Sequence, residues 1–476
     1  MEPEKLARFE PPHHILPFNS SDEGDRDELK VRGYALVLIN QLKQSKSLNT
    51  VQYSAIKNFT DGKQDAVAIG KKLNAEYVLE SNYKTSGGRL WITSELHNVN
   101  SGLVEETYSD EDIDLADKFK QLKTFVAGVE KKLVLKFNLE PFNFAQMRGT
   151  TNEEAQGFYF QGMNLTDKRR REDAEKAVLD FEEAIRLDPE YADAYAGLAY
   201  AHTTAKVNGA DVPSHCAKAR ESVERALNLD ANLAEAYSIL AMNQHSCLWQ
   251  QTEAENSHRK AIELAPNSAF THRFYGIFLT HLGRVDESVK EIKKAIELEQ
   301  TSLFSRKQLG RALFFGRKYD DAIEQLKKTR ELDSNDDEQS RFIYLAYEMK
   351  SDYENAFEWF LKTEEIKQAA QTEKTEDDKK AEINAWRKVY AESGWQGVLR
   401  RRLEFAEQME KAGGDSFGEI ASLAAQLGEK DKAFDYLGKE IAKARLFATQ
   451  VLVDPTLDTM RSDPRFDDLI RSRWKT

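Results

Sequence analysis

A repeat of 34 residues in the middle of the chain constrains the fold more than any other feature of the sequence. Apolar and small residues recur at this spacing through three consecutive segments. The residues in register are Tyr275, Leu309 and Ile343; Leu279, Leu313 and Tyr347; Ser288, Ala322 and Ala356; Ile292, Leu326 and Phe360; and Ala295, Thr329 and Thr363. Self-similarity of this length is typical of a solenoid, in which each repeat packs against its neighbours.

The pattern within each repeat predicts two antiparallel helices. Small residues let the helices approach closely, and larger apolar residues fill the space against the next pair. Asp188-Pro189 and Ala265-Pro266 end one pair and begin the next, because proline is tolerated in a first helical turn but not in a helix interior. Earlier repeats carry the same second helix with altered loops, and residues 206–213 are predicted to be an insertion.

Three segments of these repeats, FEEAIRLDPEY, ADAYAGLAYAH and AEAYSILAMNQ, resemble the tetratricopeptide (TPR) family. The resemblance implies an α-solenoid of six TPR units at residues 153–368. The polar residues 368–383 are expected to form a solvated helix or a flexible connection.

Residues 369–476 are expected to hold one or more further helical repeats and a C-terminal cap. Asp454-Pro455 and Asp463-Pro464 each offer a capping carboxylate before a proline in a first helical turn. The residues expected to cover the last repeat are Leu457, Met460, Phe466 and Leu469.

Residues 14–140 follow a different pattern, in which short β-rich runs alternate with amphipathic stretches. The expected strands are 15–18, 51–53, 77–83, 90–96 and 103–108, and the expected helices are 29–42, 66–73 and 115–137. The sequence therefore predicts an α+β protein: a tail at residues 1–13, a small α/β domain with a mixed sheet and helices at 14–140, and an all-α TPR superhelix.

The element order of the N-terminal unit, with the segments YVLE and GGRLWIT, resembles the TolB-amino-terminal-like domain. That domain precedes helical repeats in bacterial signalling proteins, including winged-helix regulators, adenylate cyclases and kinases. The chain departs from the family at His13-His14, where small apolar residues are usual. The resemblance implies a sensory or scaffolding part of a bacterial signalling or transcription-regulating protein, without its output domain.

Composition excludes several classes of protein. Acidic residues outnumber basic ones by 81 to 68, and the net charge of −13 opposes binding to nucleic acid or anionic lipid. No run of apolar residues is long enough for a membrane span, and the N-terminus lacks the apolar core of a signal peptide. We expect a soluble cytoplasmic chain, or a periplasmic one if an upstream membrane anchor has been removed.

Cys216 and Cys247 are the only cysteines, and their positions match no metal-ligand or redox motif. We expect them to be unpaired helix residues packed near loops. The alternative is a disulfide between them.

The sequence contains no motif for catalysis, for a cofactor or for a metal. Its nine histidines lack metal-binding spacings, and no nucleophile elbow or kinase signature is present. The triplet Gly70-Lys71-Lys72 is not a phosphate-binding loop, because Asp65 stands where that motif requires glycine. We therefore expect no catalytic residues, no cofactor and no metal.

The first helix of each TPR pair lines the concave groove of the solenoid. Arg273, Lys307 and Arg341 recur every 34 residues on these helices, and Arg311 lies one turn after Lys307. Cations in this arrangement favour an acidic peptide or a C-terminal carboxylate as the partner. The residues expected to add apolar contacts are Phe304, Phe314 and Phe315.

Lys307 and Arg311 resemble the basic pair with which some TPR domains clamp a peptide carboxylate. The asparagines that complete this clamp are not matched, and Ile277 is one mismatch. The alternative is that the cations pair with neighbouring Asp or Glu and only solvate the groove.

These observations favour a non-catalytic scaffold or sensor module that binds partner proteins or peptides in the TPR groove. Two alternatives remain open: a transcriptional regulator that acts on DNA, and an enzyme whose N-terminal domain is a small-ligand or nucleotide site. The negative charge and the lack of a winged-helix pattern count against the first. The sequence specifies neither the oligomeric state nor the identity of the partner.

Overall fold

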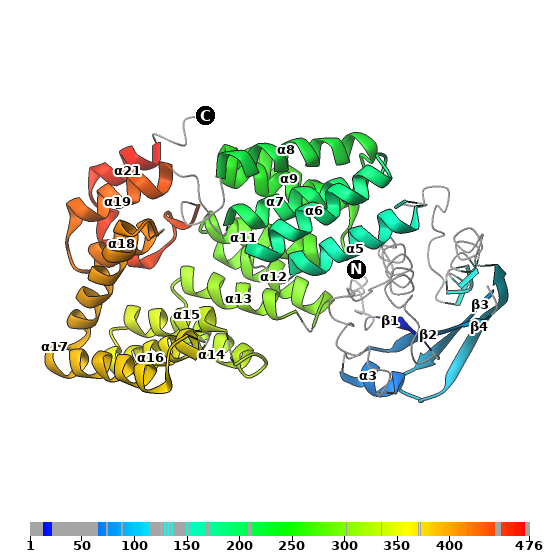
Figure 1. The fold of residues 1–476 in the computed structure, drawn as a ribbon, viewed down its shortest axis with the longest axis horizontal. Helices are drawn as coiled ribbons and strands as arrows, with labels where there is room; N and C mark the ends of the chain where they lie inside the picture. The colour runs from blue at the N-terminus through cyan, green and yellow to red at the C-terminus, as the bar shows by residue number, and fades with distance from the viewer. Residues whose placement is uncertain are drawn as a thin grey trace, which may run out of the picture.

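The computed structural model gives the chain as an N-terminal sheet region followed by a long array of helices (Figure 1). The described residues are 13–20 (backbone only), 65–72, 75–86, 89–114, helical residues at 125, 128–129, 131–133 and 135–136, then 149–150, 152–167, 171–207, 212–300, 302–334, 336–369, 371, 373–414, 416–442 and 449–471. The helix predicted at 29–42 and the strand predicted at 51–53 lie outside these residues.

Four strands form one mixed sheet in the order β1-β2-β3-β4. The strands are β1 (His13–Ser20), β2 (Tyr77–Ser86), β3 (Arg89–Asn98) and β4 (Val104–Asp114). β1 pairs with β2 in parallel, and the other neighbours are antiparallel. The strand predictions at 15–18, 77–83 and 90–96 are confirmed, and most of the run at 103–108 lies in β4.

Helical residues contact both faces of this sheet. On one face, the Lys132 ammonium group lies 5.0 Å from the centre of the Tyr108 ring. On the other face, the helix α3 (Ala66–Lys72) approaches Val78 of β2 so closely that a Cβ on Gly70 would lie 2.7 Å from it and 2.4 Å from Val99. Glycine is therefore required where α3 meets the sheet.

Six antiparallel helix pairs follow in the described part of residues 153–369 (Figure 1). Their bounds are α5 (Glu153–Asp167) with α6 (Arg171–Leu187), α7 (Ala192–Val207) with α8 (Val212–Leu229), α9 (Ala234–Asn243) and its π-helical continuation η3 (Gln244–Leu248) with α10 (Gln251–Leu264), α11 (Ala269–His281) with α12 (Val285–Leu298), α13 (Leu303–Phe315) with α14 (Tyr319–Arg330), and α15 (Asp337–Met349) with α16 (Tyr353–Ala369). Part of the predicted insertion at 206–213 is helical, because α7 ends at Val207 and α8 begins at Val212.

Close contact within the pairs explains the small residues of the repeat. A Cβ on Gly276 would lie 2.5 Å from Ile292, and a Cβ on Gly310 would lie 2.5 Å from Leu326. Each of these apolar side chains is buried between the helices of its own pair. The 34-residue register found in the sequence is therefore a register of helix-pair packing.

The turns inside the pairs keep the same register. Trp249, Gly283, Arg317 and Ser351 lie 34 residues apart and all adopt positive φ, at 59°, 74°, 59° and 59°. Such a residue ends a helix and reverses the chain, and it costs free energy when it carries a side chain. Only one of the four positions carries glycine, so residue type alone does not predict the conformation.

The chain continues as the long helix α17 (Glu376–Lys411), which is kinked at Gly394 with φ 61°. The second half of the polar segment, residues 376–383, thus belongs to this helix, and Thr375 and Asp378 form a capping box at the start of α17. The remaining elements are α18 (Phe417–Gln426), α19 (Lys430–Ala442), the 3₁₀ helix η4 (Pro455–Met460) and α21 (Pro464–Arg471). No described helix combines the length and the apolar character needed to cross a bilayer.

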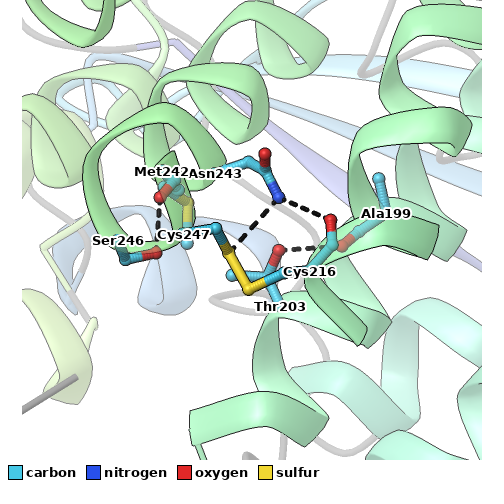
Figure 2. Close-up of a disulfide and its surroundings, with 7 residues drawn as sticks. All are labelled: Ala199, Thr203, Cys216, Met242, Asn243, Ser246 and Cys247. Atoms are coloured by element: carbon cyan, nitrogen blue, oxygen red, sulfur yellow. Dashed lines mark hydrogen bonds between the residues drawn. A yellow bond between two sulfur atoms is a disulfide. The ribbon is translucent and has the colours of Figure 1, made fainter. Parts of the chain in front are cut away.

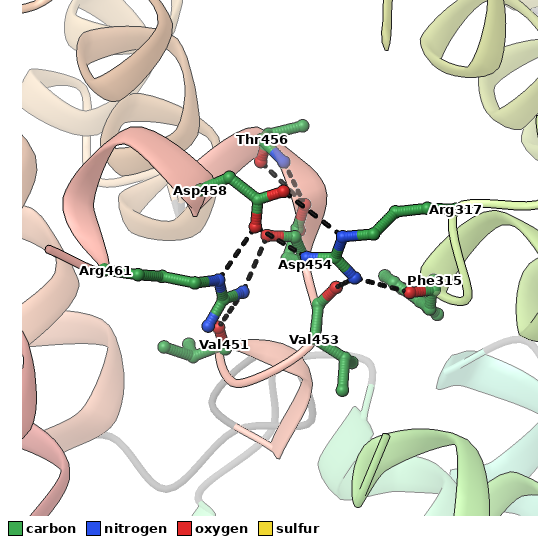
Figure 3. Close-up of polar contacts among 8 residues, drawn as sticks. All are labelled: Phe315, Arg317, Val451, Val453, Asp454, Thr456, Asp458 and Arg461. Carbon is green, nitrogen blue, oxygen red and sulfur yellow. Dashed lines mark hydrogen bonds and ion pairs between the residues drawn. The ribbon is translucent and has the colours of Figure 1, made fainter. Parts of the chain in front are cut away.

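The C-terminal segment packs on α18 and α19 and also reaches back to the middle of the array (Figure 3). Arg317, in the turn after α13, donates to both carboxylate oxygens of Asp458 at 3.2 and 2.6 Å and to the Val453 carbonyl at 3.2 Å. Asp454 caps η4 by accepting from the Thr456 backbone N–H, as the Asp-Pro pattern predicts. The last repeat is thereby tied to a turn more than a hundred residues earlier.

Candidate peptide-binding surface

The first helices of successive pairs lie next to one another in the order α11, α13, α15. Their side chains make contacts from one first helix to the next. The Arg273 guanidinium on α11 lies 5.2 Å from the Phe304 ring centre on α13, and Arg311 on α13 lies 5.1 Å from the Phe342 ring centre on α15. The predicted cations therefore lie on adjacent first helices, and two of them contact an aromatic ring of the next first helix.

Arg273 on α11 is buried, with 7% of its surface exposed. Its Nη1 donates to Glu299 Oε2 at 3.1 Å, and Glu299 is 3% exposed. The guanidinium also lies 5.4 Å from the Phe274 ring centre and 5.7 Å from that of Phe270. This residue joins α11 to the end of α12 and is not positioned to meet a peptide.

Lys307 and Arg311 are half-buried and have acidic partners at the start of α15. Lys307 Nζ donates to Asp336 Oδ2 at 2.5 Å, and Arg311 Nη1 donates to Glu338 Oε1 at 2.9 Å. Burial opposes ionisation of Asp336, but Lys307 and hydrogen bonds outweigh it and hold its pKa below the usual value. Burial likewise opposes ionisation of Glu338, and Arg311 with the neighbouring cations lowers its pKa.

Arg341 differs from these three cations because its side chain is exposed. It lies 4.9 Å from the Phe342 ring centre, and no carboxylate of the described residues lies within ion-pair distance. Its charge nevertheless acts on Glu338 and on Asp454 of the C-terminal segment. Of the four predicted cations, Arg341 is therefore the one most available to a partner.

The three predicted phenylalanines do not share one environment. Phe314 and Phe315 are 1% and 2% exposed and pack in the core with Phe342, so the contacts assigned to them in the groove are made with the protein interior instead. Phe304 is only partly buried and lies beside Arg273. The sequence pattern did not separate these cases, because aromatic residues occur on both faces of α13.

A second group of charges lies between α15, α17 and α18. The Trp395 indole N–H donates to Glu348 Oε1 at 2.8 Å, and Arg402 Nη2 donates to Glu419 Oε1 at 3.1 Å. Burial raises the pKa of Glu348 to about 7, although Arg402 and the Trp395 hydrogen bond act in the opposite direction. Glu348 is thus a buried carboxyl that changes charge near neutral pH.

Glu348 is expected to make the protein less stable as pH rises from about 4.5 to about 7. The folded state keeps the proton through this range while the unfolded state loses it, so stability falls with rising pH by about 3 kcal/mol in total. Glu348→Gln removes the titration and retains an acceptor for Trp395. Urea denaturation measures the unfolding free energies of both proteins. The value for the variant minus the value for wild type is expected to increase as pH rises across this range. A difference that stays constant with pH contradicts the assignment to Glu348.

Cys216 and Cys247 are joined by a disulfide, which corrects the expectation of two unpaired cysteines (Figure 2). Cys216 lies near the start of α8 and Cys247 near the end of η3. Antiparallel packing brings these ends together, and Asn243 Nδ2 donates to the Cys216 carbonyl at 3.0 Å beside them. The sequence alone does not predict this disulfide, because the two cysteines belong to different repeats.

Several scattered histidines are brought into pairs by the repeats. His202 Nδ1 lies 3.0 Å from His215 Nδ1, and His245 Nε2 lies 3.1 Å from His281 Nδ1. Burial lowers the pKa of His202 to about 4 and that of His258 to about 3. His202 and His258 are therefore neutral at physiological pH and serve as structural residues of the array.

One group of residues with metal-binding chemistry was missed by the sequence analysis. Glu80, Glu95 and His97 bring one ligand atom each to within 4.8 Å of one another on β2 and β3. A search for linear motifs does not find them, because Glu80 belongs to a different strand. The usable signal was the pair of consecutive predicted strands, 77–83 and 90–96, whose antiparallel pairing in the structure aligns Glu80 with Glu95.

No protein-family model and no curated protein matches the sequence. Among solved structures, the chain is similar to YrrB, described as a TPR protein with an unusual peptide-binding site, at 22% identity over 39% of this chain and 91% of that chain, with a TM-score of 0.29. A thermophilic TPR protein from Thermus thermophilus is similar at 14% identity over 40% of this chain and 91% of that chain, with a TM-score of 0.30. A monomeric IFIT1 mutant with Gppp-AAAA is similar at 15% identity over 75% of this chain and 77% of that chain, with a TM-score of 0.41. By its own helix pairs, which keep a 34-residue register from α9 to α16, the region from α5 to α16 is a repeat array of the TPR type.

Proposed function

We propose that the chain is a non-catalytic protein-interaction module that binds an acidic peptide segment along the face made by α11, α13 and α15. The observation that carries the proposal is the exposed Arg341 at the end of a row of cations on adjacent first helices. Because Arg273, Lys307 and Arg311 already have acidic partners, Arg341 is the main contact for a carboxylate and the others tune the potential of the surface.

The wider setting of the module follows from the two parts of the chain. We assign residues 14–140 to a TolB-like α/β domain, residues 153–368 to the TPR array and residues 369–476 to a further repeat and cap. The mixed sheet with its antiparallel β2–β3–β4 meander supports the first assignment. In this setting the chain is the sensory or scaffolding part of a bacterial signalling or regulatory protein.

The disulfide supports an oxidising compartment as the place of action, such as the periplasm. Disulfides persist in such compartments and are rare where glutathione and thioredoxin keep thiols reduced. Cys216 and Cys247 are the only cysteines of the chain, so no other thiol competes for the pairing.

Arg341→Glu is expected to weaken binding of an acidic peptide by about 10-fold or more, because a direct charge contact becomes a repulsion. The measurement is fluorescence anisotropy with peptides selected on an acidic peptide array, with free and amidated C-termini compared. Arg220→Glu is the matched control, since Arg220 is an exposed cation on the second helix α8 and pairs only locally with Glu224. Equal affinity of wild type and Arg341→Glu for every selected peptide contradicts the proposal.

A further inference from the structure

We propose that Glu80, Glu95 and His97 form a binding site for a divalent transition-metal ion of the zinc class on the face of the sheet that carries α3. The site lies in the N-terminal unit and is independent of the peptide-binding face. No linear metal-binding motif marks it, because its ligands come from both strands of a hairpin.

The strand register places the three side chains on one face. Glu80 of β2 is paired with Glu95 of β3, and Val78 is paired with His97. Residues two apart on a strand point to the same side, so all four side chains share a face. Val78 is in contact with α3, which identifies that face as the one that the helix covers.

The distances in the group suit a shared ion better than direct hydrogen bonds. His97 Nε2 lies 3.4 Å from Glu80 Oε2 and 3.6 Å from Glu95 Oε2. Hydrogen bonds of this type are shorter, at about 2.7–3.2 Å. Two ligand atoms that each lie about 2.0–2.2 Å from a tetrahedral zinc ion are about 3.3–3.6 Å apart.

His97 supplies an independent reason to expect a ligand. Its side chain is buried, with 9% of the residue exposed, and Nε2 has no hydrogen-bond partner within the described part of the chain. A buried ring nitrogen left in this state costs free energy. Since the atom faces two carboxylate oxygens, a cation between the three groups would satisfy all of them at once.

The chemistry of the three ligand atoms selects the class of ion. One imidazole nitrogen and two carboxylate oxygens suit zinc and similar first-row ions, whereas calcium and magnesium prefer oxygen ligands only. Two carboxylates and one neutral imidazole also leave a net negative charge that a dication compensates. Three protein ligands leave one coordination position open for water. On the same face of the sheet, Asp65 accepts a hydrogen bond from the Ala68 backbone N–H at the start of α3.

The test is a zinc titration of the full chain after removal of metals with EDTA. Competition with a chromophoric zinc indicator is expected to give one site per chain with a Kd below about 10 µM. Co²⁺ in place of Zn²⁺ is expected to give the intense visible absorption of a low-symmetry, four-coordinate site. A wild-type chain that shows neither saturable binding nor this absorption overturns the proposal without any variant.

Variants locate the binding. Glu80→Gln/Glu95→Gln is expected to weaken zinc binding by more than about 100-fold, since even residues behind the ligands change affinity by about 10- to 100-fold. Two controls are expected to retain the site: Glu106→Gln, which removes a carboxylate from the neighbouring strand β4, and His215→Asn, which breaks the paired histidines of α7 and α8. Equal zinc affinity of the double variant and wild type overturns the assignment to these residues.

Thermal stability of the metal-free proteins distinguishes a metal site from an ion pair that only stabilises the fold. If the group binds zinc, Glu80→Gln/Glu95→Gln retains its thermal stability in EDTA, because like charges are removed, and loses only the zinc-dependent rise in Tm. If His97 is merely held as an imidazolium between two carboxylates, the same variant loses stability in EDTA and wild type gains none from zinc. The second result overturns the proposal.

Discussion

Arg273→Met is expected to lower the free energy of unfolding by about 3–5 kcal/mol, because it breaks the ion pair with the buried Glu299. Methionine fills much of the volume of the aliphatic part of arginine and remains compatible with the neighbouring rings. The loss therefore comes mainly from the broken ion pair of Glu299, which is 3% exposed. Urea denaturation followed by circular dichroism measures it without the ionic screening that guanidinium introduces.

A second variant separates charge from packing at this position. Arg273→Met/Glu299→Met replaces the whole ion pair by apolar side chains, a change that is often neutral or stabilising. The double variant is thus expected to recover most of the loss. If the double variant is as unstable as Arg273→Met, the arginine acts through shape rather than through its pairing with Glu299.

Removal of the disulfide is expected to destabilise the protein by about 3–4 kcal/mol. The bond joins residues that are 31 apart in the sequence, and opening it restores the freedom of that loop in the unfolded chain. Cys216→Ala/Cys247→Ala tests this by urea denaturation under oxidising conditions. Thiol titration of the denatured wild-type chain is expected to detect no free thiol.

The reduced wild-type protein is the control for this variant. In dithiothreitol its stability is expected to fall to that of Cys216→Ala/Cys247→Ala, while the variant itself does not respond to the reductant. A wild-type chain whose denaturation midpoint is the same with and without dithiothreitol contradicts the pairing. That result would also remove the support for an oxidising compartment.

Arg273 and Arg341 show that residue type and repeat position alone do not predict which residues belong to a binding surface. They occupy equivalent positions of the repeat, yet one is buried against Glu299 and the other is exposed. The register predicts that both residues lie at the same position of the first helix of their repeat. It does not predict the acidic partner, because Glu299 comes from the connection after α12.

The helix pairs themselves were predictable because they depend on local spacing. Apolar and small residues at a fixed separation specify which faces of neighbouring helices pack, and Gly276 against Ile292 is such a contact. The two strands of the β2–β3 hairpin were likewise visible as consecutive β-rich runs, 77–83 and 90–96. Both depend on residues that are close in sequence or repeat at a constant interval.

The sequence by itself determined the repeat length, the pairing of helices and the presence of a separate strand-rich unit. Tertiary structure alone decided which cations have partners, that Cys216 bonds to Cys247, and that Glu80, Glu95 and His97 meet on one face of the sheet. The physical reason is that burial and electrostatic pairing depend on distances between side chains from different elements. A periodic pattern specifies the side of a helix or strand on which a residue lies, whereas the charge, hydrogen-bond and ligand environment of that residue depends on what the folded chain places opposite it.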